Sequence, residues 1–265
     1  MGGYAWISLT TDFGTSDGFV AACHGAIARV APQVRVIDVT HQVPPGEVAR
    51  GATVLAQTVA YLPESVHVAV VDPGVGTERR GIVISTPGGL LVGPDNGLLM
   101  WAATALGGVD LVVQLSNQAW FAPAVSRTFH GRDDFAPTAA RLAAGAPVTD
   151  AGPALDPATL TRLPDPVVTT GDGWIQAEVT AIDRFGNVQL AAPGRLLAGL
   201  GTHLQVGGVR AQRGDTFGAV PPGGVVIYVN SADRVEIAVN RGRAAVVLSV
   251  VPGDVLRISE RHRAQ

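Results

Sequence analysis

Residues 6–38 read WISLTTDFGTSDGFVAACHGAIARVAPQVRVID, and this stretch decides the fold. Its apolar run Trp6–Thr10 predicts a strand, apolar residues at helical spacing predict a helix over Gly18–Val30, and Val34–Asp38 predicts a second strand. A strand, a helix and a strand in succession are typical of a βαβ unit, in which the helix joins two parallel strands.

The same alternation continues towards the middle of the chain. A helix is expected over Glu47–Tyr61, followed by a strand at Val66–Val71. The sequence therefore predicts an N-terminal, Rossmann-like α/β domain with a mostly parallel sheet over residues 1–165. Its further expected elements are strands at Ile82–Thr86 and Leu90–Val92, a turn at Pro94–Gly97, a helix through Trp101, and a last helix from Asp133 to Ala144.

The composition changes between Ala146 and Asp172. This stretch is rich in Pro, Asp, Thr and Gly without periodicity, which predicts an interdomain connection. Short β-type runs separated by glycine-rich turns follow it and predict a small β-barrel or sandwich, which we expect as a C-terminal domain over residues 172–265. These runs are Trp174–Ile182, Val188–Leu190, Val225–Val229, Val235–Val239 and Val246–Val250.

The bulk composition narrows the classes of function. The chain has 265 residues, 47% of them hydrophobic, a net charge of -3 and no run of Lys or Arg, which favours a small-molecule partner over nucleic acid. The single cysteine, Cys23, lies on an apolar stripe with Ile27, which indicates packing rather than redox chemistry. No secretion signal is recognisable and no apolar run approaches the ~20 residues that span a bilayer, so we expect a cytoplasmic protein without a membrane partner.

Polar loops follow the predicted strands, at the edge where open α/β sheets bind ligands. After the first strand, Asp12 and Asp17 stand just before a helix. Two carboxylates there are suited to the hydroxyls of a ribose or to an ammonium group. The competing interpretation is that Asp17 caps the helix and Asp12 belongs to a turn.

A second loop follows the third strand and carries Asp72 and Arg79. Its Gly74 and Gly76 complete neither the Gly-x-Gly-x-x-Gly nor the Gly-Lys-Ser/Thr phosphate motif. We therefore expect the glycines to let the backbone approach a ligand, with the carboxylate and the guanidinium pointing into the same cavity. A surface ion pair is the competing interpretation.

A third loop carries His130, and the neighbouring Gly131 leaves the approach to its ring open. The ring is either a structural residue or a catalyst. A metal site is a weaker interpretation, because Asp133 follows at a ligand-like spacing but no second histidine or acidic cluster accompanies it.

In the second domain, Asp183, Phe185 and Asn187 belong to one short segment. An aromatic ring can stack on a purine, and an amide matches the donor and acceptor on an adenine edge. A β-turn built from Asp, Gly and Asn explains the same residues without a ligand.

Six motifs, in order through nearly the whole chain, resemble the S-adenosyl-L-methionine hydroxide adenosyltransferases, which are hydrolytic relatives of the bacterial fluorinase and chlorinase. The motifs are Thr11-Asp12-Phe13-Gly14, Val71-Asp72-Pro73-Gly74-Val75-Gly76, Gly93-Pro94-Asp95-Asn96-Gly97, Phe129-His130-Gly131-Arg132-Asp133, Ile182-Asp183-Arg184-Phe185-Gly186-Asn187 and Asn230-Ser231.

The resemblance implies an N-terminal α/β domain, a C-terminal β-barrel, and a homotrimer with active sites between the N-terminal domain of one subunit and the C-terminal domain of the next. It also implies that an Asp, Arg and His trio, here Asp72, Arg79 and His130, holds the attacking water. The halogenases have aromatic or small residues at the positions of Asp72 and His130, which favours water over halide.

The resemblance further implies a set of substrate contacts. Ala232 stands where the halogenases have an arginine, which leaves the contact to the methionine carboxylate unassigned. The implied contacts are Asp12 for the ribose, Asp17 and Asp183 for the methionine end, Thr128 near the reaction centre, Phe185 and Asn187 for the adenine, and Ser231, Glu236 and the backbone of Val239 from the neighbouring barrel.

The implied reaction is hydrolysis of S-adenosyl-L-methionine to adenosine and L-methionine, by attack of activated water on the ribose C5′. The sulfonium of the substrate is already cationic, and its sulfur departs as a neutral thioether. We therefore expect no general acid, no metal and no other cofactor. Three alternatives stay open: a halide nucleophile, a binding module for adenosine or S-adenosyl-L-methionine without catalysis, and a metal-dependent hydrolase using Asp12, Asp72, His130 and Asp133.

Overall fold

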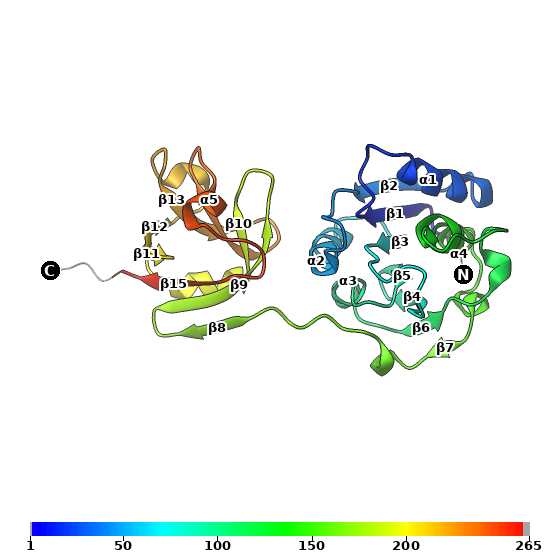
Figure 1. The fold of residues 1–265 in the computed structure, drawn as a ribbon. Helices are drawn as coiled ribbons and strands as arrows, with labels where there is room; N and C mark the ends of the chain where they lie inside the picture. Colours follow the sequence, from blue (N-terminus) through cyan, green and yellow to red (C-terminus); the bar gives the residue numbers. More distant parts are fainter. Residues whose placement is uncertain (1, 262–265) are drawn as a thin grey trace. The chain divides into compact units, whose positions relative to one another are not determined.

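The computed structural model describes residues 2–261, and the chain divides into two compact units, one ending at Leu163 and one beginning at Pro164 (Figure 1). The first unit is an α/β domain and the second a β-barrel, so the predicted fold class is confirmed. Within residues 2–261 no helix is both long and apolar enough to cross a membrane.

The first unit contains a seven-stranded sheet in the order β2-β1-β3-β5-β4-β6-β7. The pairs β1–β2, β1–β3 and β3–β5 are parallel, whereas β4 and β6 join the sheet antiparallel. The predicted βαβ rhythm thus builds one half of the sheet, and hairpin-like pairing extends the other half. The strands are β1 (Trp6–Thr11), β2 (Arg35–Thr40), β3 (Ser65–Val70), β4 (Gly81–Thr86), β5 (Gly89–Pro94), β6 (Leu111–Gln114) and β7 (Ala154–Leu155).

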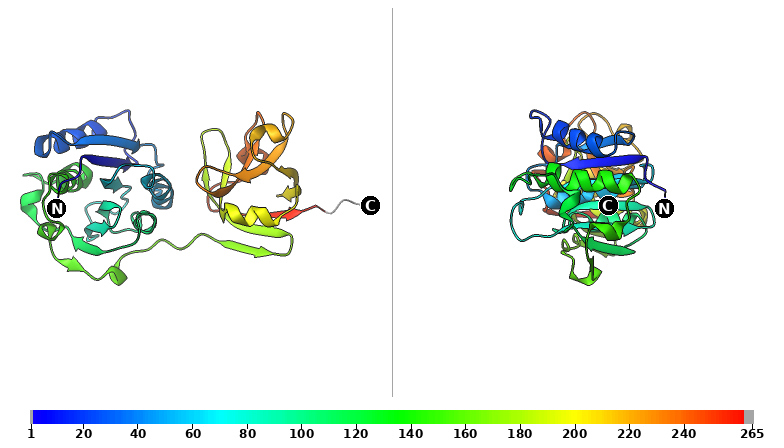
Figure 2. Two further views of the ribbon diagram at one scale, coloured as in Figure 1. Left: turned by 180° about the vertical axis from the view of Figure 1, so that it is seen from behind. Right: turned by 90° about the vertical axis from the view of Figure 1, so that its right-hand side faces the viewer.

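Helices cover both faces of this sheet (Figure 2). The helices α1 (Phe19–Val30) and α4 (Ala136–Ala143) pack on one face through residues such as Ile27 and Leu142, and α2 (Val48–Val59) and α3 (Met100–Ala105) pack on the other. The central strand β3 has all six residues buried, as expected of a parallel strand covered on both sides.

The second unit is a closed barrel. Its strands follow the order β10-β14-β13-β12-β11-β15-β9, and β9 pairs with β10 to complete the ring, while β8 (Val168–Gly171) adds to the edge of β9. Closure leaves no unpaired edge among the seven barrel strands. They are β9 (Trp174–Ile182), β10 (Val188–Pro193), β11 (His203–Val206), β12 (Val209–Arg213), β13 (Val225–Val229), β14 (Arg234–Val239) and β15 (Val255–Glu260).

One predicted element of this unit is wrong. The sequence predicts a strand at Val246–Val250, but Ala244–Leu248 form the helix α5. The amides of Val246 and Val247 both donate to the carbonyl of Arg243, and Ser249 at φ 55° ends the helix. A short apolar run does not distinguish a strand from a helix by periodicity alone, and here the exposed valines take no part in sheet pairing.

The stretch predicted as an interdomain connection, Ala146–Asp172, also contains short strands. β7 pairs with β6 of the first unit, and β8 pairs with β9 of the second. The change in composition therefore spans the end of one unit and the start of the other.

Candidate active site

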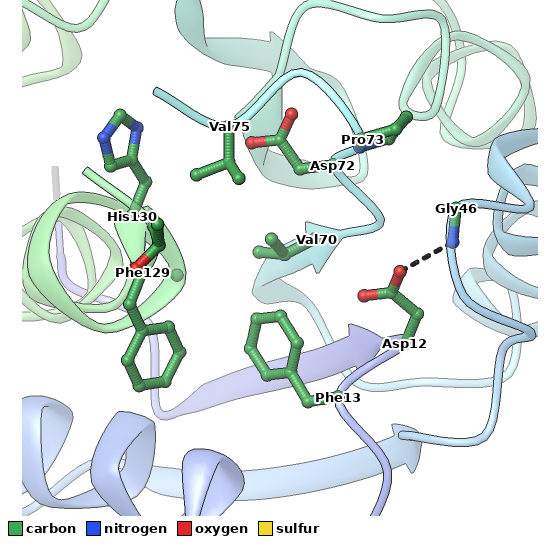
Figure 3. Close-up of a pocket in the computed structure, with 11 residues that line it drawn as sticks. Asp12, Phe13, Gly46, Val70, Asp72, Pro73, Val75, Phe129 and His130 are labelled. Atoms are coloured by element: carbon green, nitrogen blue, oxygen red, sulfur yellow. Dashed lines mark hydrogen bonds between the residues drawn. The ribbon is translucent and has the colours of Figure 1, made fainter. Parts of the chain in front are cut away.

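A cavity of about 300 Å³ lies where β1 and β3 end, at their carboxyl edge (Figure 3). The chain leaves β1 for β2 on one side and reaches β3 on the other, so this is the switch point at which open α/β sheets bind ligands. The residues that line the cavity are Asp12, Phe13, Gly46, Val70, Asp72, Pro73, Val75, Thr128, Phe129, His130 and Gly131.

The side chain of Arg79 joins Asp72 to His130. Its Nε and Nη2 donate to Asp72 Oδ2 at 2.9 and 2.5 Å, and Nη2 lies 2.7 Å from His130 Nδ1. The three residues come from two loops that are 51 positions apart, measured from Arg79 to His130. The structure therefore brings together the acid, the guanidinium and the imidazole that the sequence singled out.

Packing fixes this arrangement. The side chain of Asp72 is 5% exposed and that of Arg79 13%, and the guanidinium carbon lies 5.2 Å from the centre of the Phe135 ring. The charge of Arg79 compensates the buried carboxylate, and its planar fork is held by the ring as well as by the hydrogen bonds. The pair is buried, unlike the surface ion pair of the competing interpretation.

The hydrogen bonds also decide the tautomer of His130. A guanidinium only donates, so the ring nitrogen Nδ1 accepts, and the neutral ring carries its proton on Nε2. Asp72 Oδ1, in contrast, is buried and has no hydrogen-bond partner within residues 2–261. Asp72 and His130 both line the cavity, so an acceptor without a partner and a ring donor belong to its border.

Asp12 is fixed on the opposite side of the cavity. Its Oδ2 accepts a hydrogen bond from the Gly46 amide at 2.9 Å (Figure 3). The preceding residue, Thr11, is also held: His41 Nδ1 lies 2.8 Å from Thr11 Oγ1, and His41 Nε2 lies 3.0 Å from Asp38 Oδ1. The loop after β2 therefore supports the loop after β1.

Asp38 at the end of this chain of contacts is itself shared. Its Oδ1 is also 2.9 Å from His24 Nε2. Burial acts to raise the pKa of Asp38, but the hydrogen bonds from His24 and His41 outweigh it and lower that pKa. The carboxylate is therefore a stable anchor for the His41 ring.

Of two further predicted substrate contacts in the first unit, Thr128 lies at the cavity and Asp17 does not. Thr128 lines the cavity, with its Oγ1 3.3 Å from Ser126 Oγ. Asp17 is exposed and is not among the lining residues, and it does not cap α1 either, since the N-cap residue is Gly18 and makes no side-chain capping bond.

The predicted contacts of the second unit form a turn. Asp183 Oδ1 accepts from the amides of Phe185 and Asn187 at 2.8 and 2.9 Å, and its Oδ2 accepts from Asn187 Nδ2 at 2.8 Å. These bonds are those of the β-turn interpretation. The Phe185 ring, however, is 68% exposed, so the turn presents an aromatic surface to its surroundings.

The remaining predicted contacts lie on and beside β14. Glu236 accepts from the Tyr228 hydroxyl and, at 2.7 Å, from Asn230 Nδ2. Burial, the hydrogen bond to Glu236 and the charges of Glu236 and Asp183 raise the pKa of Tyr228. Val239 is buried in the barrel, and Ser231 is in the exposed turn before β14.

Sequence reasoning missed Asp134. It lies one helical turn after His130, and its Oδ2 is 3.4 Å from His130 Nδ1. The i, i+4 spacing of the two residues was the available signal. Asp133, which the sequence did single out, instead binds Arg132 at 2.6 Å and the Ser126 amide at 2.8 Å, outside the cavity lining.

No group of three or more His, Cys, Asp or Glu side chains within residues 2–261 is arranged to hold a metal ion. The set Asp12, Asp72, His130 and Asp133 is included in that statement. Asp12 Oδ2 is bound to the Gly46 amide, and Asp72 Oδ2 and His130 Nδ1 are bound to Arg79.

Comparison with known proteins gives one family over both units. Residues 7–152 match the SAM hydroxide adenosyltransferase N-terminal domain, and residues 177–257 match the corresponding C-terminal domain. An (R)-S-adenosyl-L-methionine hydrolase of Salinispora arenicola is 61% identical over 98% of this chain and 99% of its own.

Two further similarities set the range of the family. An uncharacterized conserved protein from Thermotoga maritima, known as a crystal structure, matches with a TM-score of 0.90 and 35% identity over 96% of this chain and 100% of its own. A fluorinase of Actinopolyspora mzabensis is more distant, at 27% identity over 96% of each chain.

Proposed function

The chain belongs to the SAM hydroxide adenosyltransferase family, as the six sequence motifs predicted, and we propose that it hydrolyses S-adenosyl-L-methionine to adenosine and L-methionine. The observation that carries the assignment of the site is the Arg79 side chain, which binds Asp72 and His130 at 2.5 and 2.7 Å beside the cavity. Asp72 and His130 hold the attacking water, and Arg79 positions both.

The reaction is a single displacement at the ribose C5′. The water oxygen forms a bond to C5′ while the bond from C5′ to sulfur breaks, and that electron pair neutralises the sulfonium as methionine departs. His130 Nε2–H donates to the water, and Asp72 Oδ1, which has no hydrogen-bond partner in the described part of the chain, takes the proton that the water loses. Such proton transfer contributes typically ~10²–10⁴-fold, and alignment of water, C5′ and sulfur adds to it.

The other residues of the cavity bind the substrate. Asp12, held by the Gly46 amide, retains acceptor capacity for the ribose hydroxyls, and Thr128 lies beside the reaction centre. Phe13, Val70 and Val75 exclude water around the sulfonium, so that the fixed groups rather than solvent set its surroundings.

We propose that the adenine and the methionine end are bound by a barrel from another copy of the chain, in a homotrimer. The residues that line the cavity include no Asn or Gln amide to match the donor and acceptor on an adenine edge. The barrel carries the predicted contacts Asn187, Ser231 and Glu236, the exposed Phe185 ring, and further exposed valines at Val246 and Val251. Exposed apolar surface of this kind marks an interaction site.

The experiment that tests the activity is product analysis in ¹⁸O-labelled water. Hydrolysis at C5′ puts the label in the 5′ oxygen of adenosine and leaves methionine unlabelled. A halide nucleophile gives a 5′-halo nucleoside in buffers containing chloride or fluoride, and a binding module gives no product at all. Either result overturns the proposal.

Mixing variants tests the shared site. Asp72→Asn and Asn187→Ala each inactivate every site of a pure trimer. If a site combines two copies, dissociating and reassembling a mixture of both variants restores part of the activity, because some sites then receive neither substitution. No recovery, or a monomer by light scattering, contradicts the trimer.

We also propose that the enzyme acts in the cytoplasm and needs no cofactor. Cys23, the one cysteine of the sequence, is buried and free, and burial raises the pKa of its thiol to about 12. A free thiol of this kind is compatible with the reducing conditions of the cytoplasm. Full activity after dialysis against a chelator supports the second point, and recovery only on adding a divalent metal contradicts it.

A further inference from the structure

The reaction proposed above leaves one buried ionisable group beside His130 unused. The side chain of Asp134 is 13% exposed, its Oδ2 is 3.4 Å from His130 Nδ1, and its Oδ1 has no hydrogen-bond partner in the described part of the chain. A buried carboxyl group with an unpaired oxygen is costly, so its presence at this position requires an explanation.

Two groups of opposite character face the same nitrogen. Arg79 Nη2, which can only donate, is 2.7 Å from His130 Nδ1, and Asp134 Oδ2, which accepts when ionised, is 3.4 Å from it. The nitrogen accepts from Arg79 when the ring is neutral. When the ring is protonated it has to donate, and Asp134 is then the available partner.

The local helix geometry holds Asp134 at this point. Residues Gly131–Phe135 form a π-helical turn ahead of α4, a rare conformation that concentrates at functional sites. Gly131 lies against Phe13, where an added Cβ would come 2.7 Å from the ring, so the turn has no room to shift towards the loop after β1.

The charges around Asp134 come from several elements. His130 and Asp133 lie on its own segment, and Arg79, which compensates Asp72, comes from the loop after β3. Three elements pack against the segment. Helix α1 contributes Cys23, which faces Asp133 and Arg132, and the strand β5 contributes no titratable side chain. Helix α4 carries Arg141, which donates to the Ala119 carbonyl. Burial raises the pKa of Asp134, and the positive charges of His130 and Arg79 oppose that rise.

We propose that Asp134 is a positioning residue that competes with Arg79 for His130 Nδ1 and thereby sets the pH below which the ring protonates and hydrolysis stops. The proposal rests on the function proposed above. In the neutral state the ring is bound to Arg79 and presents Nε2–H to the water. In the protonated state the ring donates to Asp134, its contact with Arg79 becomes repulsive, and the added charge disfavours the cationic substrate.

Removing the Asp134 carboxylate is therefore expected to increase the rate of hydrolysis at acid pH. Asp134→Asn keeps the shape of the side chain but cannot stabilise a protonated ring. A charge at this separation shifts a titration by about 1 pH unit or more, so the acid limb of the kcat/KM profile, which reports the free enzyme, moves down by about 1 pH unit. One pH unit below the wild-type midpoint, the variant keeps several times more of its maximal kcat/KM than the wild type does.

The test combines two readouts. The first is the pH profile of kcat and of kcat/KM for wild type and Asp134→Asn. The second is the ¹⁵N chemical shifts of the His130 ring, titrated without substrate and assigned among the six histidines by their loss in His130→Gln. Both midpoints move down together if Asp134 acts on the ring. The ring titration needs no turnover, so it tests this proposal even if the product analysis rejects hydrolysis.

Two variants separate charge from structure. Asp110→Asn removes an exposed carboxylate of the same unit and leaves both midpoints unchanged, and Asp134→Glu, which retains a carboxylate, keeps them closer to wild type than Asp134→Asn does. Unchanged midpoints in a folded Asp134→Asn protein overturn the proposal. So does an equal shift in Asp110→Asn, which shows a general charge effect.

Discussion

Arg79→Lys tests whether geometry, rather than positive charge, assembles the site. Arg79 makes three hydrogen bonds, two to Asp72 and one to His130, through two different nitrogens. A lysine ammonium keeps the charge but does not reach both partners in that planar arrangement. If it retains one contact to Asp72, two charge-assisted bonds are lost.

The size of the effect follows from that count. Two such bonds at about 1.5 kcal/mol each are worth about 3 kcal/mol, which corresponds to a loss of about 10²-fold in kcat. Arg79 is not among the residues that line the cavity, so its substitution removes no direct contact to the substrate. KM is therefore expected to change by less than about threefold.

The assay is steady-state formation of adenosine over a range of substrate concentrations, with Arg80→Lys as the matched control. Arg80 is the next residue and pairs with Asp95, away from the cavity. A kcat within threefold of wild type for Arg79→Lys, or an equal loss for both variants, refutes the reasoning that Arg79 orients the Asp72 and His130 pair.

Three further predictions follow from the same structure. Gly131→Ala places a methyl group 2.7 Å from the Phe13 ring and is expected to lower kcat about tenfold by displacing His130. The control Gly25→Ala, in open space on α1, leaves kcat unchanged, and equal kcat values for the two variants contradict the prediction. His41→Ala removes the support of Thr11 and is expected to raise KM about tenfold with kcat nearly unchanged, while His24→Ala has a smaller effect; a lower kcat at constant KM contradicts it. Burial lowers the pKa of His67 to about 4, so between about pH 6.5 and pH 4 the unfolded chain binds one more proton than the folded chain. The free energy of unfolding therefore falls as the pH falls through that window, by up to about 3 kcal/mol. His67→Gln is expected to lose this pH dependence in urea unfolding, and an unchanged pH slope contradicts the prediction.

The fold was predictable where periodicity and position agree. The run Trp6–Thr10, the helical spacing after Gly18 and the buried run Val66–Val71 specify β1, α1 and β3, because each has a clear period or is apolar throughout. Strands such as β11 and β12 were not predicted. Both are short: β11 has four residues whose burial alternates, whereas β12 has five residues, three of them Arg or Gln, and no alternation. Pairing with their barrel neighbours, rather than their own composition, stabilises them.

The site was predictable to the extent that it lies at strand ends. Asp12 directly follows β1, Asp72 comes two residues after the end of β3, and neighbouring parallel strands end at the same edge. The meeting of Arg79 with His130 has no signal in the spacing, since the two residues are 51 positions apart and only the packing of the loop before α4 brings them together. Asp134 was missed although its i, i+4 spacing from His130 is visible in the sequence, because that spacing alone does not predict the π-helical turn that precedes α4.

We attribute the expected choice of water over halide to Asp72 Oδ1, which has no hydrogen-bond partner within residues 2–261. A halide in the nucleophile position would lie next to Oδ1, which makes no bond to Arg79, and two unit charges at 4 Å repel by about 4 kcal/mol at the effective dielectric constant of a protein surface. Water reverses the sign of that contact, because it donates a proton to the same oxygen. The Nε and Nη2 groups of Arg79 that could have bound an anion are directed to Asp72 and His130 instead. We therefore expect adenosine as the only nucleoside product even in concentrated chloride. A 5′-chloro nucleoside formed by the wild-type enzyme would show that the carboxylate does not control the nucleophile.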